Sequence, residues 1–303
     1  MIQPFLLFAK QVLSFSGFQA SRLSRKVHDT LLMAFEDMLV HEVVMIKALV
    51  KLAKACPGKL VIDDTSNPKY GLKHATRKLK ILTNSGYHQG FKILLFLWDC
   101  EYGRIPLGFA LWHKGTKPIN ELALLGFSLL RNRYKLKPQA VVADGAFSTD
   151  KMLERLQNYG WPCVMRARNN RKLGDQRVTK LIARGYGSQQ GTLKNGTKVK
   201  LFRRKNRLYV CNRMLWTMEK AVQVYTRRWK IEEVFRALKQ CLGLNRCQQH
   251  SMRAQALYLA MCLILFTCLE LHSGQSVYKL AHSVISGNQN LENILDKRLF
   301  THC

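Results

Sequence analysis

The feature that most limits how this chain can fold is the alternation of short apolar runs with amphipathic stretches across residues 59–168. Residues 59–66 (KLVIDDTS) hold a short apolar run that ends in two acids, which predicts a strand. Residues 91–100 (FKILLFLWDC) and 105–114 (IPLGFALWHK) flank the turn-like EYGR and predict a hairpin.

From residue 121 to residue 168, stretches with the hydrophobic spacing of a helix alternate with short apolar runs typical of strands. An amphipathic helix is expected over residues 121–133, a strand over 139–148 (QAVVADGAFS), a second helix over 149–159 and a strand over 161–168 (WPCVMRAR). Strand, hairpin, helix, strand, helix and strand in this order predict an α/β fold in which a mixed sheet is flanked by helices.

Residues 169–214 differ in character from the rest. Their segment GTLKNGTKVKLFRRKNRLYV alternates basic with apolar residues and contains an Asn-Gly turn, which predicts a β-rich insertion. Its outward face should be strongly basic, and we expect it to contact the phosphates of a polyanionic partner through Arg203, Arg204, Lys205 and Arg207.

Three segments follow from these patterns and from the break at Cys56-Pro57-Gly58. We expect a helical N-terminal segment over residues 1–58, an α/β domain over 59–271 with its insertion at 169–214, and a tail over 272–303. Residues 257–269 are apolar but shorter than the roughly 20 residues of a membrane span, so a buried helix and no membrane association are expected.

The charge of the chain indicates a polyanionic partner. Its 303 residues include 49 Lys plus Arg against 19 Asp plus Glu, a formal net charge of +30. Nucleic acid is the leading candidate, because phosphate neutralisation dominates such binding. A basic ribosomal or chromatin-type protein without chemistry is the alternative. The nine cysteines include no CxxC pair and indicate reduced thiols in a cytosol.

Residues 225–239 (YTRRWKIEEVFRALK) are rich in basic side chains, and their charged residues recur at helical spacing. At about 100° per residue, Tyr225, Arg228, Glu232 and Lys239 share one narrow helical stripe that borders an apolar arc. Glu233 lies away from both the stripe and the arc, so only an ordinary surface ion pair is expected of it.

Acidic residues are scarce, so the positions of four of them, three on strands and one on a helix, are informative. Asp63 and Asp64 follow the first apolar run, Asp144 follows the strand near residue 142, and Glu232 lies on the late helix. Three carboxylates can hold two divalent ions that activate an attacking oxygen and stabilise a leaving one. An Asp at a strand end is more often a turn former, which is the competing interpretation.

These motifs resemble those of the DDE transposases of bacterial insertion sequences, in the group with a Tyr-x2-Arg-x3-Glu-x6-Lys signature. Tyr225, Arg228, Glu232 and Lys239 match all four positions and their spacings. VIDDTS resembles the first Asp motif of the family and VVADGAF the second, and the resemblance covers about residues 59–271.

The resemblance implies that residues 59–271 form an RNase H-like catalytic domain and that residues 1–58 are a candidate DNA-contacting region. It also implies cleavage at element ends and strand transfer with two Mg²⁺ ions, Mn²⁺ being an alternative. Asp144, Glu232 and either Asp63 or Asp64 would be the catalytic metal ligands, while Tyr225, Arg228 and Lys239 would hold DNA near the scissile phosphate. A homodimer in the DNA complex and a location in the bacterial cytoplasm, with the nucleoid, are expected with it.

Two other functions fit the same charge. One is a metal-dependent nuclease of the same fold that lacks strand transfer, and the other is a catalytically silent DNA-binding repressor.

Trp216, just before the signature helix, has two possible roles. It either stacks on a displaced base or anchors the insertion as a core residue.

Overall fold

A ten-stranded mixed sheet forms the centre of the protein. The computed structural model describes residues 42–69, 80–83, 86–113, 115–182, 185–247, 252–273 and 277–286. The sheet order is β1-β5-β4-β2-β6-β7-β12-β11-β10, with β3 paired to β4. The strands are β1 (Val43–Met45), β2 (Gly58–Pro68), β3 (Lys80–Thr83), β4 (Gly86–Cys100), β5 (Gly103–Trp112), β6 (Val141–Ala143), β7 (Cys163–Arg166), β10 (Gly185–Thr192), β11 (Lys198–Lys205) and β12 (Arg207–Cys211).

The middle strands are buried on both faces, which explains their almost continuous apolar sequences. Every residue from Ile93 to Trp98 in β4 is buried, and β4 and β5 form the expected hairpin. β2 pairs antiparallel with β4 and parallel with β6, and β6 pairs parallel with β7. The predicted mixed sheet is therefore confirmed.

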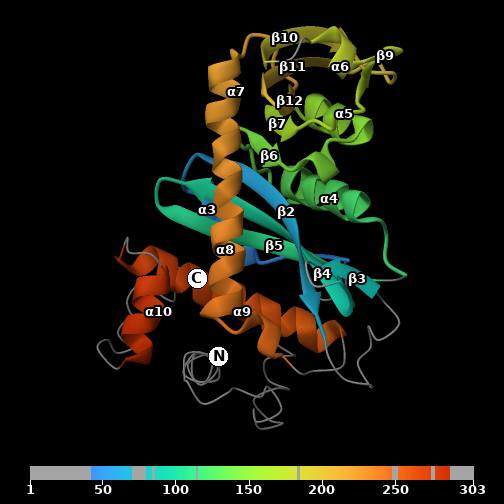
Figure 1. The fold of residues 1–303 in the computed structure, drawn as a ribbon. Helices are drawn as coiled ribbons and strands as arrows, with labels where there is room; N and C mark the ends of the chain where they lie inside the picture. The colour runs from blue at the N-terminus through green and yellow to red at the C-terminus, as the bar shows by residue number, and fades with distance from the viewer. Residues whose placement is uncertain are drawn as a thin grey trace.

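Helices cover the sheet on both faces (Figure 1). On one face, Phe127 of α4 packs edge-on against Phe96 of β4. On the other face, α7 and α8 form one long helical column, joined by a 3₁₀ turn, that crosses the sheet over β2. The helical elements are α3 (Lys47–Lys54), α4 (Ile119–Ser128), the π turn η3 (Leu129–Arg133), η4 (Gly145–Phe147), α5 (Asp150–Asn158), α6 (Val178–Leu181), α7 (Met218–Tyr225), η5 (Thr226–Arg228), α8 (Trp229–Gln240), η6 (Leu244–Arg246), α9 (Met252–Ser273) and α10 (Val277–Ile285).

The insertion is β-rich, as predicted, and it extends the main sheet. Its strand β12 pairs antiparallel with β7, with Val210 opposite Met165. The remaining strands β11 and β10 add to that edge, while β8 (Lys172–Leu173) and β9 (Gln176–Arg177) form a separate small hairpin. This continuity places the basic insertion at a fixed position relative to β6 and β7.

The N-terminal expectation is wrong at Val43–Met45, which form strand β1 because they pair with β5. Residues 1–41 of the expected helical segment, and residues 287–303 of the tail, lie outside the described residues. Among the described helices, α9 contains one 20-residue stretch, Met252–Leu271, that is long and apolar enough to cross a membrane, with a mean hydropathy of 1.9. Since 89% of the window is buried in the fold, α9 is the expected core helix, although longer than predicted.

Candidate active site

Asp63 and Asp64 lie in the interior of β2, whereas the sequence predicted that the strand would end there. β2 continues to Pro68 because it pairs with β4 along its whole length. Successive strand residues point to opposite faces of a sheet. Asp63 accordingly meets Arg228 of the helical column, with Oδ2 2.7 Å from Nη1, while Asp64 pairs with Lys92 of β4 at 2.9 Å.

Asp144 stands beside Asp63 across the sheet. The parallel pairing of β2 with β6 sets Ile62 opposite Ala143, and an aspartate follows each of them. β6 ends at Ala143, and Asp144 is the N-cap of the 3₁₀ turn η4. The end of this shorter strand, rather than the end of β2, brings the two carboxylates together.

The surroundings of Asp63 favour its protonated form. Burial raises the pKa of Asp63 to about 7, and the negative charges of Asp64 and Asp144 act in the same direction. The charge of Arg228 and the hydrogen bond from the Asp64 amide lower the pKa, but by less. A buried acid of this kind stabilises any cation that replaces its proton.

Arg228 connects the strand acid to the helix acid. Its Nη2 donates to Oε1 of Glu232, one helical turn further on, while its Nη1 donates to Asp63. Burial alone lowers the pKa of Arg228, but the negative charges around it raise the pKa above the ordinary value. Among the residues that the structure describes, no three His, Cys, Asp or Glu side chains converge closely enough to hold a metal ion. The guanidinium of Arg228 joins Asp63 and Glu232 instead.

Lys239 and Tyr225 lie at the two ends of the same stripe. Lys239 donates to Oγ1 of Thr65 at 2.6 Å and to the carbonyl of Ser66 at 3.1 Å, so it reaches β2 beyond Asp63. Tyr225 packs edge-on against Tyr209 of β12, with ring centroids 4.9 Å apart, and burial raises its pKa to about 12. Arg228 and Lys239 thus contact β2, Arg228 also holds Glu232, and Tyr225 contacts β12.

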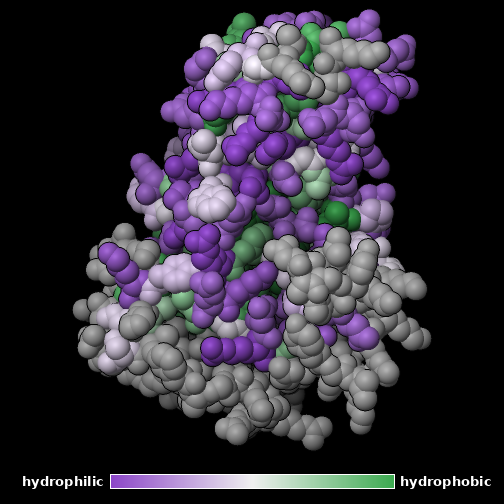
Figure 2. All heavy atoms as spheres, in the orientation of Figure 1, coloured by the Kyte–Doolittle hydropathy of each residue, from purple (hydrophilic) through white to green (hydrophobic). Residues whose placement is uncertain are grey.

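A basic pocket of about 760 Å³ adjoins this stripe. Its cations come from β7, from the β11–β12 hairpin and from the column: Arg166, Arg204, Lys205, Arg207 and Arg228. Figure 2 shows that hydrophilic side chains dominate this face over α7 and the insertion. Positive charge around a concave surface fits an anionic polymer.

Arg203 and Trp216 do not line this pocket. The side chain of Arg203 instead donates from Nη1 to the carbonyl of Ile182 at 2.7 Å. Trp216 packs partly buried against the core, and its carbonyl accepts a hydrogen bond from Lys200.

Trp229 was missed by the sequence reasoning. Its side chain lines the pocket and is 51% exposed, next to Tyr225. The signal was present, because Trp229 follows Tyr225 by four residues, and residues at that spacing share one helical face.

Comparison with known proteins assigns the family. The family model for the transposase DDE domain matches residues 54–268. A piggyBac transposase, solved in a synaptic complex with hairpin DNA, has a TM-score of 0.54 at 12% identity, and the alignment covers 98% of this chain and 71% of that one. The catalytic domain of human endonuclease V aligns at 13% identity over 82% of this chain and 99% of that one, with a TM-score of 0.27. No curated protein sequence matches the chain.

The piggyBac likeness shows a shared RNase H-like fold, in agreement with the sheet order seen here. The family model spans most of the chain, including Asp63, Asp144 and Glu232. The chain therefore belongs to the transposase DDE domain family and is a DDE-type DNA transposase.

Proposed function

We propose that this transposase binds the ends of a bacterial insertion sequence, hydrolyses a phosphodiester to free a 3′ hydroxyl, and joins that hydroxyl to target DNA. The observation that carries the proposal is that Asp63 neighbours Asp144 in the register of β2 and β6 and is joined to Glu232 through Arg228, beside a basic pocket. Acids of this kind next to phosphate-binding cations are what in-line phosphoryl transfer requires.

Asp63, Asp144 and Glu232 are the residues that would hold divalent metal. Their oxygen donors are those that Mg²⁺ prefers, and the guanidinium between Asp63 and Glu232 marks a position where positive charge is stabilised. Bound Mg²⁺, or Mn²⁺ in its place, would supply the two-ion activation of the attacking and leaving oxygens. Asp64 faces Lys92 on the other side of β2, so we assign the first catalytic position to Asp63.

The stripe and the pocket would hold DNA. Arg228 would exchange Asp63 for a phosphate of the scissile strand, and Tyr225 and Lys239 would contact the backbone on either side. Arg204, Lys205 and Arg207 would bind phosphates further along the duplex. Trp216 packs against the core, which supports an anchoring role in preference to base stacking.

Two further expectations belong to the proposal. A second copy of the chain would complete a synaptic dimer, and the protein would act on DNA in the bacterial cytoplasm. Size measurements of the protein with and without paired element ends would test the dimer.

The experiment is a cleavage and strand-transfer assay with DNA that carries the inverted repeats flanking the gene. Wild-type protein with Mg²⁺ should nick the end and join it to a plasmid. Asp144→Ala should bind the same DNA and do neither. Cleavage without joining would identify a nuclease, and binding without cleavage by the wild type would identify a repressor.

A further inference from the structure

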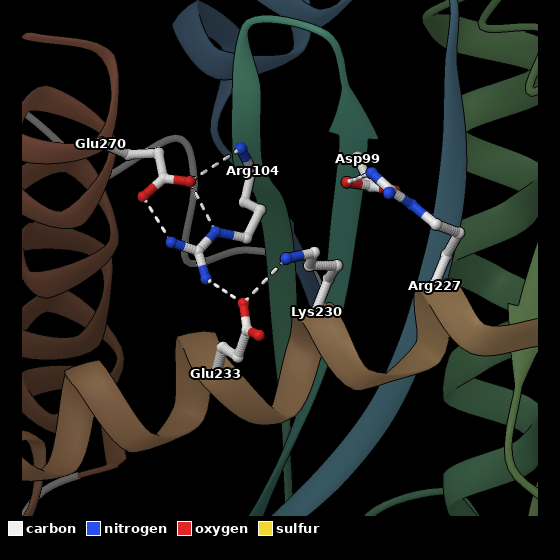
Figure 3. A network of polar contacts seen from close by, with 6 residues as sticks. All are labelled: Asp99, Arg104, Arg227, Lys230, Glu233 and Glu270. Atoms are coloured by element: carbon white, nitrogen blue, oxygen red, sulfur yellow. Dashed lines mark hydrogen bonds and ion pairs between the residues drawn. The ribbon is translucent and has the colours of Figure 1, made fainter. Parts of the chain in front are cut away.

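Arg104 at the start of β5 holds two helices by their acidic side chains (Figure 3). Its Nε and Nη2 donate to Glu270 of α9 at 2.5 and 2.6 Å, and its Nη1 donates to Glu233 of α8 at 2.7 Å. Its guanidinium also lies 5.6 Å from the ring centroid of Phe266. Glu233 is therefore anchored to the sheet and to α9, and is more than the surface residue that the sequence suggested.

A second anchor lies in η5, directly before α8. Arg227 donates from Nε and Nη2 to the two oxygens of Asp99, near the end of β4, at 2.5 and 2.7 Å. This fork gives two parallel hydrogen bonds, the most directional form of ion pair that a protein can make. Both anchors join the helical column to the β4–β5 hairpin.

Each anchoring residue is the chain neighbour of a candidate site residue. Arg227 precedes Arg228, and Glu233 follows Glu232. Neighbours on an α-helix differ by about 100° in direction, so the anchors hold one face of the helix while the site residues occupy the adjacent face. Fixing Glu233 on the hairpin thereby sets the direction in which Glu232 points.

The apolar packing of α8 does not supply this direction by itself. Ile231, Val234, Phe235 and Leu238 are buried against the core, but the hydrophobic effect is not directional and tolerates small rotations. The anchors differ, because a rotation of α8 would leave buried charges without their partners: Asp99, which would lose Arg227, is 3% exposed, and the side chain of Arg104, which would lose Glu233, is 14% exposed. A buried carboxylate that loses its cation is strongly destabilised, so a rotation of α8 that separates these pairs is costly.

We propose that Arg104 with Glu233 and Glu270, and Arg227 with Asp99, are positioning residues that fix the rotation of α8 and thereby aim the carboxylate of Glu232 at Asp63. The inference rests on the proposed function, in which Glu232 binds metal. Because a site displaced by about 1 Å can lose a hundredfold in rate, such second-layer contacts affect metal binding and chemistry more than they affect folding.

The test compares Glu233→Gln with Glu42→Gln. Each variant replaces one glutamate by glutamine, but Glu233 loses its ion pairs with Arg104 and Lys230, whereas Glu42 loses one with Lys117 at 2.6 Å, on exposed side chains away from the column. Four quantities are measured for each: the melting temperature, binding of an element-end duplex, Mn²⁺ binding to the DNA-free protein by electron paramagnetic resonance, and cleavage as a function of Mg²⁺ concentration.

Glu233→Gln should weaken Mn²⁺ binding and slow cleavage by about tenfold or more, while end binding stays within about twofold of wild type. Glu42→Gln should match wild type in Mn²⁺ binding, cleavage and end binding. Equal Mn²⁺ binding and cleavage by the two variants would overturn the inference. If Glu233→Gln does not fold, Arg227→Lys replaces it, since lysine keeps the charge but cannot form the two-point fork to Asp99; the same loss is expected, and its absence is equally decisive.

Glu232→Gln separates this failure from failure of the proposed function. If wild-type protein binds Mn²⁺ and Glu232→Gln does not, the metal role stands, and the result for Glu233→Gln decides the positioning role alone. If Glu232→Gln binds Mn²⁺ and cleaves like wild type, the proposed function fails, and the positioning role fails with it.

Discussion

Arg228 donates a hydrogen bond to Asp63, with Nη1 2.7 Å from Oδ2, and this contact occupies the side of the strand acid that faces the helix acid Glu232. A guanidinium and a divalent cation cannot occupy the same place between two carboxylates. Arg228 therefore holds the acids together in the absence of metal, and binding of a phosphate would draw it away.

Replacing Arg228 should separate metal binding from DNA chemistry. Loss of Arg228 also removes the charge that lowers the pKa of Asp63, so the titration is run over a pH series that extends into the alkaline range. Where Asp63 is ionised, Mn²⁺ should bind DNA-free Arg228→Gln severalfold more tightly because no guanidinium competes for the carboxylates. Cleavage should fall, because the phosphate contact is lost. Titration by electron paramagnetic resonance and a cleavage assay measure the two effects, and Arg236→Gln, at a cation that contacts Trp229 and not the acids, is the control. Weaker Mn²⁺ binding by Arg228→Gln would contradict the competition.

The raised pKa of Asp63 predicts how stability depends on pH in metal-free buffer. Its pKa is about 7 in the folded protein against an ordinary value of 3.8, so the folded state holds the proton more tightly than the unfolded chain. Stability from this group is complete below the ordinary pKa and is lost as pH rises to about 7. Asp63→Asn removes this dependence. Its free energy of unfolding relative to wild type should rise from about pH 4 to about pH 7 and then level off, as urea unfolding with a chelator would show. A pH-independent difference would contradict the burial effect.

The two adjacent aspartates should differ sharply in cleavage. Asp63→Asn should abolish it, since Asp63 lies beside Asp144 and is joined to Glu232 through Arg228. Asp64→Asn removes one charge of a partly exposed pair with Lys92, which costs about 1 kcal/mol or less of stability and leaves cleavage largely intact. Circular dichroism confirms folding, and cleavage in Mg²⁺ gives the comparison. Equal losses in the two variants would show that β2 does not present a single acid to the site.

The strands and the signature stripe were predictable because local patterns encode them. The continuous apolar run of β4 indicates a strand that is buried on both faces, and the spacing of Tyr225, Arg228 and Glu232 indicates that they share one helical face. The extent of β2 was not predictable, since pairing with β4 carries the strand past Asp63 through polar residues that read as a turn.

The Arg104 anchor was not predictable either. Its partners Glu233 and Glu270 lie 129 and 166 residues further along the chain, and no local pattern marks a contact between such distant positions. Only the assembled sheet brings the start of β5 against α8 and α9. The sequence assigned Glu233 to the surface because a helical wheel shows which residues share a face, but not what packs against that face.

The basic pocket predicts that DNA binding depends on salt concentration mainly through three residues. Each phosphate contact contributes about 0.9 to the slope of the logarithm of affinity against the logarithm of salt concentration, because counterions are released. Replacing Arg204, Lys205 and Arg207 together by glutamine should reduce that slope by up to roughly 2.7. The measurement is binding of an element-end duplex over a series of salt concentrations.

The matched control removes three charges from elsewhere. Arg133, Lys135 and Lys137 are exposed and follow α4, the helix on the opposite face of the sheet from α8. Their replacement by glutamine lowers the net charge by the same amount, so it reports the general effect of charge on association. A slope that falls equally in both variants would mean that net charge, and not the pocket, determines DNA binding. Arg203→Gln should leave the slope unchanged and lower the melting temperature, because Arg203 donates to the Ile182 carbonyl and does not line the pocket.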